Sequence, residues 1–258
     1  LFNQQRIQAM RDGFITLLKT LPNSINQSVI QIQKLAFNTP EVLLGKTLPI
    51  TGGVVQRIKA HCLNQPQQQT YLSDGDIALS GHQLWQRVLS ASFDLQSNYK
   101  VKVGDIVAVS GEKSVDYVVN MLATNLIGAT VVPLGVDVPS ERLNTILDNT
   151  KFKLIIGALE HNHIVQQVLT LDHHQAVKED QVHAHQHNTE PFYLIYTSGS
   201  TGIPKGVAGT EHGLLNRCLW MQDEFNTASA ASAVHITEMG YIRAIWEMYL
   251  PLVTGQPL

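Results

Sequence analysis

The chain has 258 residues, of which 44% are hydrophobic and 15% charged, and its formal net charge is -3 at pH 7. This length and composition allow one large domain or two small ones with a substantial core. The charge balance leaves no basic surface to hold a nucleic-acid backbone. No apolar run reaches the roughly 20 residues of a membrane-spanning helix, and no signal-peptide pattern opens the chain. We therefore expect a cytoplasmic globular protein with no nucleic-acid or membrane partner.

The first 50 residues read differently from the rest. Apolar residues recur at three- and four-residue steps from Ile7 to Leu21, which predicts an amphipathic helix that ends at Pro22 and Asn23. Residues 22–52 have little regular pattern, contain three prolines and end at the pair Gly52-Gly53, so we expect a connector there. A domain boundary near residue 50 follows.

From residue 54 the pattern alternates between helices and short strands. Brief apolar, β-branched runs separated by helical stretches are typical of a buried parallel sheet in the α/β class. We expect helices at 54–64, 82–97, 114–127 and 139–149, a hairpin-like pair at 69–73 and 76–80, and strands at 105–111, 129–134, 153–157 and 192–197. The polar segment 158–190 predicts a surface helix and a loop. Cys62 and Cys218, far apart in helix-like segments, are expected to be two buried thiols and not a disulfide or metal site.

The stretch 196-YTSGSTGIPKGV-207 follows the last of these strands directly. In an open α/β sheet, ligands bind beyond the carboxyl ends of the strands. Glycines allow a close backbone approach and an anion-binding nest of N–H groups, and the hydroxyls and one lysine add donors and a positive charge. The residues expected to bind a polyphosphate are Thr197, Ser198, Gly199, Ser200, Thr201, Gly202, Lys205 and Gly206.

Two other kinds of loop are rich in glycine and hydroxyl groups: a plain hairpin and the P-loop of the NTPases. A plain Gly/Ser hairpin has no use for so many donors together with a lysine. The P-loop of the NTPases requires a Ser or Thr directly after its lysine to hold Mg²⁺, whereas Gly206 follows Lys205 here. The polyphosphate interpretation is therefore the one we favour.

The same residues carry a family resemblance. The run from Tyr196 to Val207 resembles the phosphate loop of the adenylate-forming enzymes, and most closely that of adenylation domains of nonribosomal peptide synthetases. Three further stretches are similar to other motifs of that family: 79-LSGHQL-84, where Gln83 stands in place of a usual Glu, 126–156 and 245–258. The resemblance covers residues 51–258 as the N-terminal part of an adenylation domain core. Residues 1–50 resemble, more weakly, the tail of an upstream condensation domain and its linker.

The resemblance implies a two-step reaction. A carboxylic acid attacks the α-phosphate of ATP, and the acyl group of the resulting acyl-adenylate passes to the phosphopantetheine thiol of a carrier protein domain. Lys205 and Thr201 take catalytic roles in this assignment, because preformed donors can stabilise the departing pyrophosphate. A catalytically silent nucleotide-binding remnant and a free-standing acyl-CoA ligase remain as alternatives.

The chain opens at Leu1 and stops at Leu258 within what reads as folded sequence, so we expect a piece of a longer protein. The family's adenine motif, ribose-binding acid, most Mg²⁺ ligands and C-terminal lysine would lie beyond Leu258. We therefore predict that these 258 residues alone form no acyl-adenylate. ATP–pyrophosphate exchange by the isolated chain above a blank would contradict this.

The resemblance places the acid substrate against Tyr241, Ile242, Arg243 and Trp246. Members that activate amino acids commonly carry an Asp three or four residues before the Trp, where Arg243 and Ile242 stand here. Burying an ammonium group without a partner costs several kcal/mol. This favours an acid without a free α-amino group, or one with a second anion that pairs with Arg243. The alternatives are that Arg243 bonds Glu247 on one helix face, and that Glu238 replaces the missing Asp.

Histidines raise the question of a metal. His183, His185 and His187 alternate, so an extended backbone would place all three on one side, with His173 and His174 nearby. A solvated linker is the interpretation we favour, because no ligand set with a recognised spacing accompanies them. No metal site is predicted within the chain.

Overall fold

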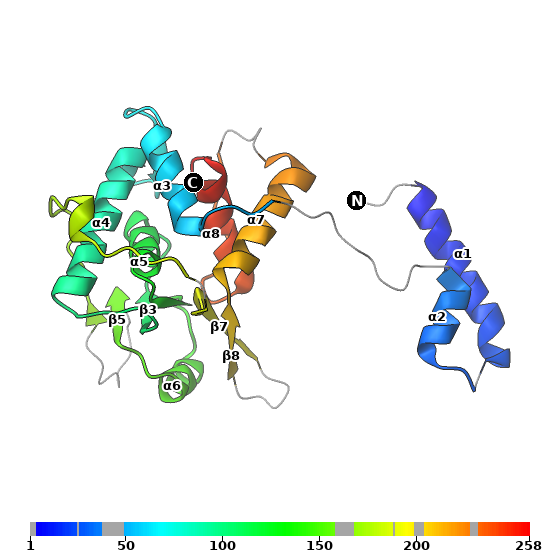
Figure 1. Ribbon diagram of the computed structural model, residues 1–258. Coiled ribbons are helices and arrows are strands. Elements are labelled where there is room, and N and C mark those ends of the chain that lie inside the picture. Colours follow the sequence, from blue (N-terminus) through cyan, green and yellow to red (C-terminus); the bar gives the residue numbers. More distant parts are fainter. Residues whose placement is uncertain are drawn as a thin grey trace. The chain divides into compact units, whose positions relative to one another are not determined.

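The computed structural model describes residues 4–24, 26–37, 49–157, 168–187, 189–198, 204–227 and 232–258. The chain forms two compact units, Leu1–Thr47 and Leu48–Leu258 (Figure 1). Within the described ranges no helix is long and apolar enough to cross a bilayer.

The first unit contains two helices that lie against each other, α1 (Gln4–Thr20) and α2 (Val29–Phe37), joined through the 3-10 turn η1 (Leu21–Asn23). The prediction of α1 is confirmed, whereas the prediction of an irregular connector over 22–52 is wrong at α2. A capping box starts this helix: Ser28 N–H donates to Gln31 Oε1 at 2.9 Å, and Gln31 N–H donates to Ser28 Oγ at 3.4 Å. These bonds satisfy amides that the helix itself leaves free.

The second unit is an α/β fold whose elements follow the predicted ranges to within two residues wherever a range was predicted. Its helices are α3 (Val54–Asn64), α4 (Gly81–Ser97), α5 (Val115–Leu126), α6 (Ser140–Asn149), α7 (Glu211–Phe225) and α8 (Ile242–Thr254), with the short turn η2 (Glu179–Gln181). Its strands are β1 (Thr70–Ser73), β2 (Ala78–Ser80), β3 (Ile106–Ser110), β4 (Thr130–Leu134), β5 (Leu154–Gly157), β6 (Val168–Leu169), β7 (Tyr193–Ser198) and β8 (Pro204–Gly209).

The main sheet has the strand order β6-β5-β3-β4-β7-β8. The strands from β6 to β7 are parallel, which confirms the predicted parallel sheet, and β8 is antiparallel to β7. β1 and β2 form the separate antiparallel pair that the sequence predicted. Because β3 is central and the chain moves first to β4 and then to β5 on its other side, the sheet has a topological switch point at β3 and β4.

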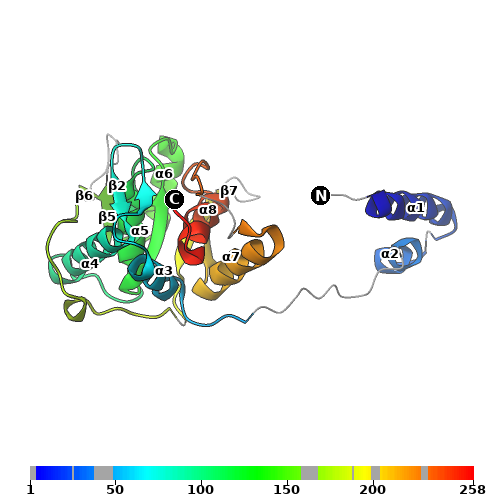
Figure 2. The same cartoon turned by 90° about the horizontal axis from the view of Figure 1, so that it is seen from above.

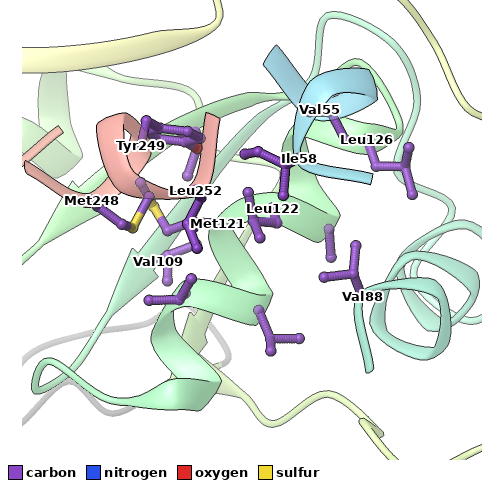
Figure 3. Close-up of a cluster of buried hydrophobic side chains, with 14 of the residues drawn as sticks. Val55, Ile58, Val88, Val109, Met121, Leu122, Leu126, Met248, Tyr249 and Leu252 are labelled. Atoms are coloured by element: carbon purple, nitrogen blue, oxygen red, sulfur yellow. The ribbon is translucent and has the colours of Figure 1, made fainter. Parts of the chain in front are cut away.

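Alternate strand residues face two different apolar layers. Val107, Val109 and Val131 belong to the larger core with α3, α4, α5, α7 and α8, whereas Ala108 and Val132 pack with α6. α6 accordingly lies on the opposite side of the sheet from α5 (Figure 1; Figure 2 gives the view from above). Figure 3 shows α5 side chains such as Met121 and Leu122 gathered with residues from the neighbouring helices. This two-sided burial explains why the strands read as continuous apolar runs.

One prediction falls on a less regular part of the chain. The surface helix expected within 158–190 is not present in residues 168–187, where η2 is the one helical turn, and residues 158–167 lie outside the described part.

The cysteine prediction is confirmed, since both thiols are free and buried. Burial raises the pKa of Cys62 and of Cys218 to about 12, so neither is a reactive thiolate at neutral pH.

Candidate functional site

The glycine-rich stretch connects two paired strands at the carboxyl end of β7. Thr197 lies opposite Lys205, and Ser198 lies opposite Pro204. Of the predicted phosphate-binding residues, Thr197, Ser198, Lys205 and Gly206 lie in these strands, while Gly199, Ser200, Thr201 and Gly202 lie outside the described residues. The antiparallel pairing belongs equally to a plain hairpin, so pairing by itself does not identify a ligand.

The ends of the two strands bring a hydroxyl and an ammonium group together. Directly opposed residues of an antiparallel pair have their side chains on one face, so Thr197 and Lys205 share a face. By the period of two, this is also the face of Ile195, which belongs to the larger core. Thr197 and Lys205 are both exposed. An anion at the strand ends would therefore meet both groups.

The strand that leads into the stretch is held from the other face. Arg142 of α6 donates from Nη2 to the backbone oxygen of Tyr196 at 2.7 Å. The Tyr196 hydroxyl shares a hydrogen bond with Thr150 Oγ1, and the residue as a whole is 7% exposed. Burial raises the pKa of this phenol, which stays neutral. Tyr196 thereby fixes the end of β7 on the α6 side of the sheet.

A cavity of about 160 Å³ opens beside this strand end, between the carboxyl ends of β4 and β7, α6 and the residues before α8. We call it the edge cavity. Its walls are mostly apolar, with the ionisable side chains Asp137, Arg142 and Glu238 among them. It is lined by Pro133, Leu134, Gly135, Asp137, Val138, Pro139, Arg142, Ile146, Tyr196, Glu238, Met239, Gly240 and Tyr241.

A second, more polar cleft of about 610 Å³ lies at the topological switch point. Residues that follow β3, β4 and β5 meet there with the first turns of α5, as expected for the carboxyl edge of an open sheet. It is lined by Ser110, Gly111, Glu112, Ser114, Asp116, Tyr117, Asn120, Val136, Asp137 and Gly157. Asp137 borders both hollows, so they are neighbours on one edge of the sheet.

The predicted acid-binding residues do not share one environment. Tyr241 lines the edge cavity, Ile242 is 52% exposed, and Trp246 is half-buried against the core. The Arg217 guanidinium lies 5.7 Å from the centroid of the Trp246 ring, a cation–π contact that the sequence did not predict. Arg217 is 29 positions away in the chain, and no local pattern links the two.

Arg243 is paired with Glu247, which is the sequence-based alternative to a contact between Arg243 and the substrate. Its Nε donates to Glu247 Oε1 at 3.0 Å, one turn along α8. Burial alone would raise the pKa of Glu247, but hydrogen bonds from Thr237, Arg243 and Ile236 lower it overall. Glu238, the other alternative, pairs with Lys113 at 3.2 Å. Glu247 and Glu238 thus both have protein partners.

The rings of His185 and His187 are neighbours, with centroids 6.2 Å apart, whereas His173 and His187 are buried against different partners. His173 is buried, with Nε2 2.7 Å from Asn120 Oδ1 and Nδ1 3.1 Å from Asp116 Oδ1, and burial lowers its pKa. His187 is also buried, and its Nε2 lies 3.0 Å from the Asn125 carbonyl oxygen. Across the described residues, no three His, Cys, Asp or Glu side chains are grouped so as to hold a metal ion.

Comparison with known proteins identifies the family. The model of the AMP-binding enzyme family matches residues 58–258. Tyrocidine synthase 1 of Brevibacillus parabrevis is 29% identical over 166 residues, which are 61% of this chain and 15% of that protein. Vanchrobactin synthetase VabF of Vibrio anguillarum is 31% identical over 234 residues, 84% of this chain and 8% of that protein. The chain thus spans a small part of these relatives.

A solved structure shows the same fold. The N-terminal subdomain of Klebsiella oxytoca NpsA, in complex with 3-hydroxybenzoyl-AMSN, superposes with a TM-score of 0.65 at 21% identity, covering 79% of this chain and 52% of that one. The expected α/β architecture is confirmed by this likeness. Family, relatives and fold agree with the resemblance of residues 196–207. The chain belongs to the AMP-binding enzyme family and is related there to the adenylation domains of nonribosomal peptide synthetases.

Proposed function

We propose that this chain is part of an enzyme that activates a carboxylic acid with ATP and loads it on a carrier protein in nonribosomal peptide biosynthesis. The observation that carries the proposal is the match of residues 58–258 to the AMP-binding family together with the place of the glycine-rich stretch, which begins at the carboxyl end of β7 with Thr197 and Lys205 facing each other. Membership of the AMP-binding family supports ATP as the nucleotide.

In the first proposed step, an oxygen of the acid forms a bond to the α-phosphorus of ATP, and the bond from that phosphorus to pyrophosphate breaks. Negative charge grows on the leaving pyrophosphate, where Lys205, the hydroxyl groups and the backbone N–H groups of the stretch stabilise it. Gly199, Ser200, Thr201 and Gly202 belong to this proposed cradle, with Thr201 in a catalytic role beside Lys205.

In the second proposed step, the phosphopantetheine sulfur of a carrier domain forms a thioester with the acyl carbon, and AMP leaves. Mg²⁺ would accompany ATP and requires oxygen ligands. Among the described residues no three His, Cys, Asp or Glu side chains are grouped as a metal site, and we assign no Mg²⁺ ligand to them. Residues 1–50 are proposed to be the tail and linker of an upstream condensation domain, which together with the carrier domain would be the partner of this region.

The proposed substrate is an acid without a free α-amino group. Ile242 stands four residues before Trp246, where an ammonium-binding carboxylate is expected in amino-acid-activating members, and its side chain is half exposed. Arg243 already has an anionic partner in Glu247, so it does not require a second acid group on the substrate. The NpsA structure holds a 3-hydroxybenzoyl group, which likewise has no α-amino group, and this compound class belongs in the test.

A hydroxamate-trapping panel on the full-length gene product tests the proposal. We expect ATP-dependent hydroxamate formation with aryl or aliphatic acids, and a lower rate for the matched α-amino acids, because an unpaired ammonium group is costly to bury. Phenylpropanoic acid against phenylalanine is one such pair. A clear preference for the amino acid would refute the substrate class. ATP binding without any exchange would favour the catalytically silent alternative.

A further inference from the structure

Residues 236–241 form the wall of the edge cavity next to α8, and we call them the wall segment. Glu238, Met239, Gly240 and Tyr241 line the cavity directly. The segment lies outside the helices and strands, and Gly240 has a φ of +91°. Because regular backbone pairing does not hold this wall, side chains from other elements must position it.

Glu247 holds the wall segment from the α8 side. Its Oε2 accepts the N–H groups of Thr237 at 2.8 Å and Ile236 at 3.3 Å, and its Oε1 accepts the Thr237 hydroxyl at 2.6 Å. The side chain is 9% exposed. A carboxylate so well supplied with donors is strongly bound to them, since charge-assisted hydrogen bonds are stronger than neutral ones. Arg243 adds a fourth bond and holds the carboxylate in place.

Lys113, which belongs to a different element, holds the same segment. It comes from the turn between β3 and α5, and its Nζ donates to the Ile236 carbonyl oxygen at 2.8 Å and to Glu238 Oε1 at 3.2 Å. Ile236 is thus bound at both backbone groups, its N–H by Glu247 and its oxygen by Lys113. The two side chains lie 134 positions apart in sequence and fix one short stretch between them.

We propose that Lys113 and Glu247 are positioning residues that clamp the wall segment and so determine which acids the edge cavity accepts. This inference rests on the proposed function, because it assigns the edge cavity to the acid substrate. It also gives Arg243 a supporting role behind Glu247 in place of a contact with the substrate. Neither Lys113 nor Glu247 touches the reacting atoms in this assignment.

We expect release of the wall segment to weaken binding of the acid more than it slows the reaction with ATP. Small displacements of a wall that positions a substrate can change rates by about 100-fold. Neither Lys113 nor Glu247 belongs to the stretch assigned to the ATP phosphates, which begins at the end of the β7–β8 pair. Releasing the wall should therefore raise the KM for the acid by about 10-fold or more and leave the KM for ATP within about 2-fold.

Two measurements on the full-length protein test the clamp together. ATP–pyrophosphate exchange gives the KM values, and amide hydrogen exchange reports how firmly the wall segment is held. Glu247→Ala and Lys113→Ala should each raise the KM for the acid, and Glu247→Ala should speed amide exchange at Ile236 and Thr237. Glu247→Gln, which keeps an acceptor for the two N–H groups, should restore much of the protection. Glu224→Ala and Lys102→Ala, at exposed positions of α7 and of the loop before β3, are the matched controls and should change neither readout.

The outcomes separate the two proposals. Because both residues hold Ile236, the double variant should raise the KM for the acid less than the product of the single effects. Faster amide exchange with an unchanged KM for the acid would overturn the clamp, as would an equal rise in both KM values. If the unaltered protein shows no ATP–pyrophosphate exchange with any acid, the proposed function fails. Even then, unchanged amide protection at Ile236 in Glu247→Ala would overturn the clamp. Should Glu247→Ala not fold, Thr237→Val removes a single bond and serves in its place.

Discussion

Replacing Lys205 with alanine in the full-length protein is expected to lower ATP–pyrophosphate exchange about 100-fold. The side chain is exposed and stands opposite Thr197 at the end of the β7–β8 pair, where it supports no core packing. Removing one preorganised donor to a developing charge typically costs about 10²–10³ in rate. The loss should be seen in the exchange rate at saturating acid, with the melting temperature unchanged.

Two further variants serve as controls for Lys205→Ala. Lys102→Ala removes an exposed lysine from the loop before β3 and should leave exchange unaltered. Lys205→Arg keeps the positive charge and should recover part of the rate, because a guanidinium still binds phosphate but with a different donor geometry. If Lys205→Ala exchanged as fast as the unaltered protein, the assignment of this stretch to the phosphates would be wrong.

Gly157→Ala is expected to be the most damaging single substitution in the sheet. Gly157 ends β5 with a φ of +104°, and a Cβ there would lie 1.9 Å from the backbone oxygen of Ser110 on the paired strand β3. The added methyl group has no flexible neighbour to displace, so the strands must separate. Steric strain of this kind together with the disfavoured dihedral should lower the free energy of unfolding by about 3 kcal/mol or more.

Gly104→Ala is the matched control for that substitution. Its φ is +81°, but nothing lies within 4 Å of the Cβ position, so it isolates the conformational cost of a left-handed residue. That cost is about 1–2 kcal/mol. Urea denaturation of both variants should give a clearly larger loss for Gly157→Ala. Equal losses would mean that the contact with Ser110 relaxes easily.

The regular elements of the sheet could be predicted because their residues agree locally and globally. β3, β4 and β5 are short β-branched runs that become buried on both faces, and the intervening helices carry apolar stripes. Burial of this kind leaves a periodic signal in the sequence. The helix α2 begins with a recognisable capping box of Ser28 and Gln31, but the prolines on either side of it are more typical of an irregular connector, and these favour the wrong prediction.

The contacts of the candidate site could not be predicted in the same way. Lys113 reaches Ile236 and Arg217 reaches the Trp246 ring, and neither contact has a local spacing that reveals it. Tertiary pairs of this kind depend on the fold that brings the elements together. Arg243 was different, because the i+4 spacing to Glu247 on one helix face made the pair a predictable alternative.

The antiparallel return of β8 has a thermodynamic consequence for ligand binding. Ser198 and Pro204 are neighbours across the strand pair, so the connection between them must span only about the 4.8 Å that separates paired strands. The ends are brought together by the sheet before any ligand arrives. Loop-closure entropy, which grows with the logarithm of the length to be closed, is thus already paid on folding. A nucleotide that binds at this strand end therefore does not have to offset that closure entropy with its own binding free energy.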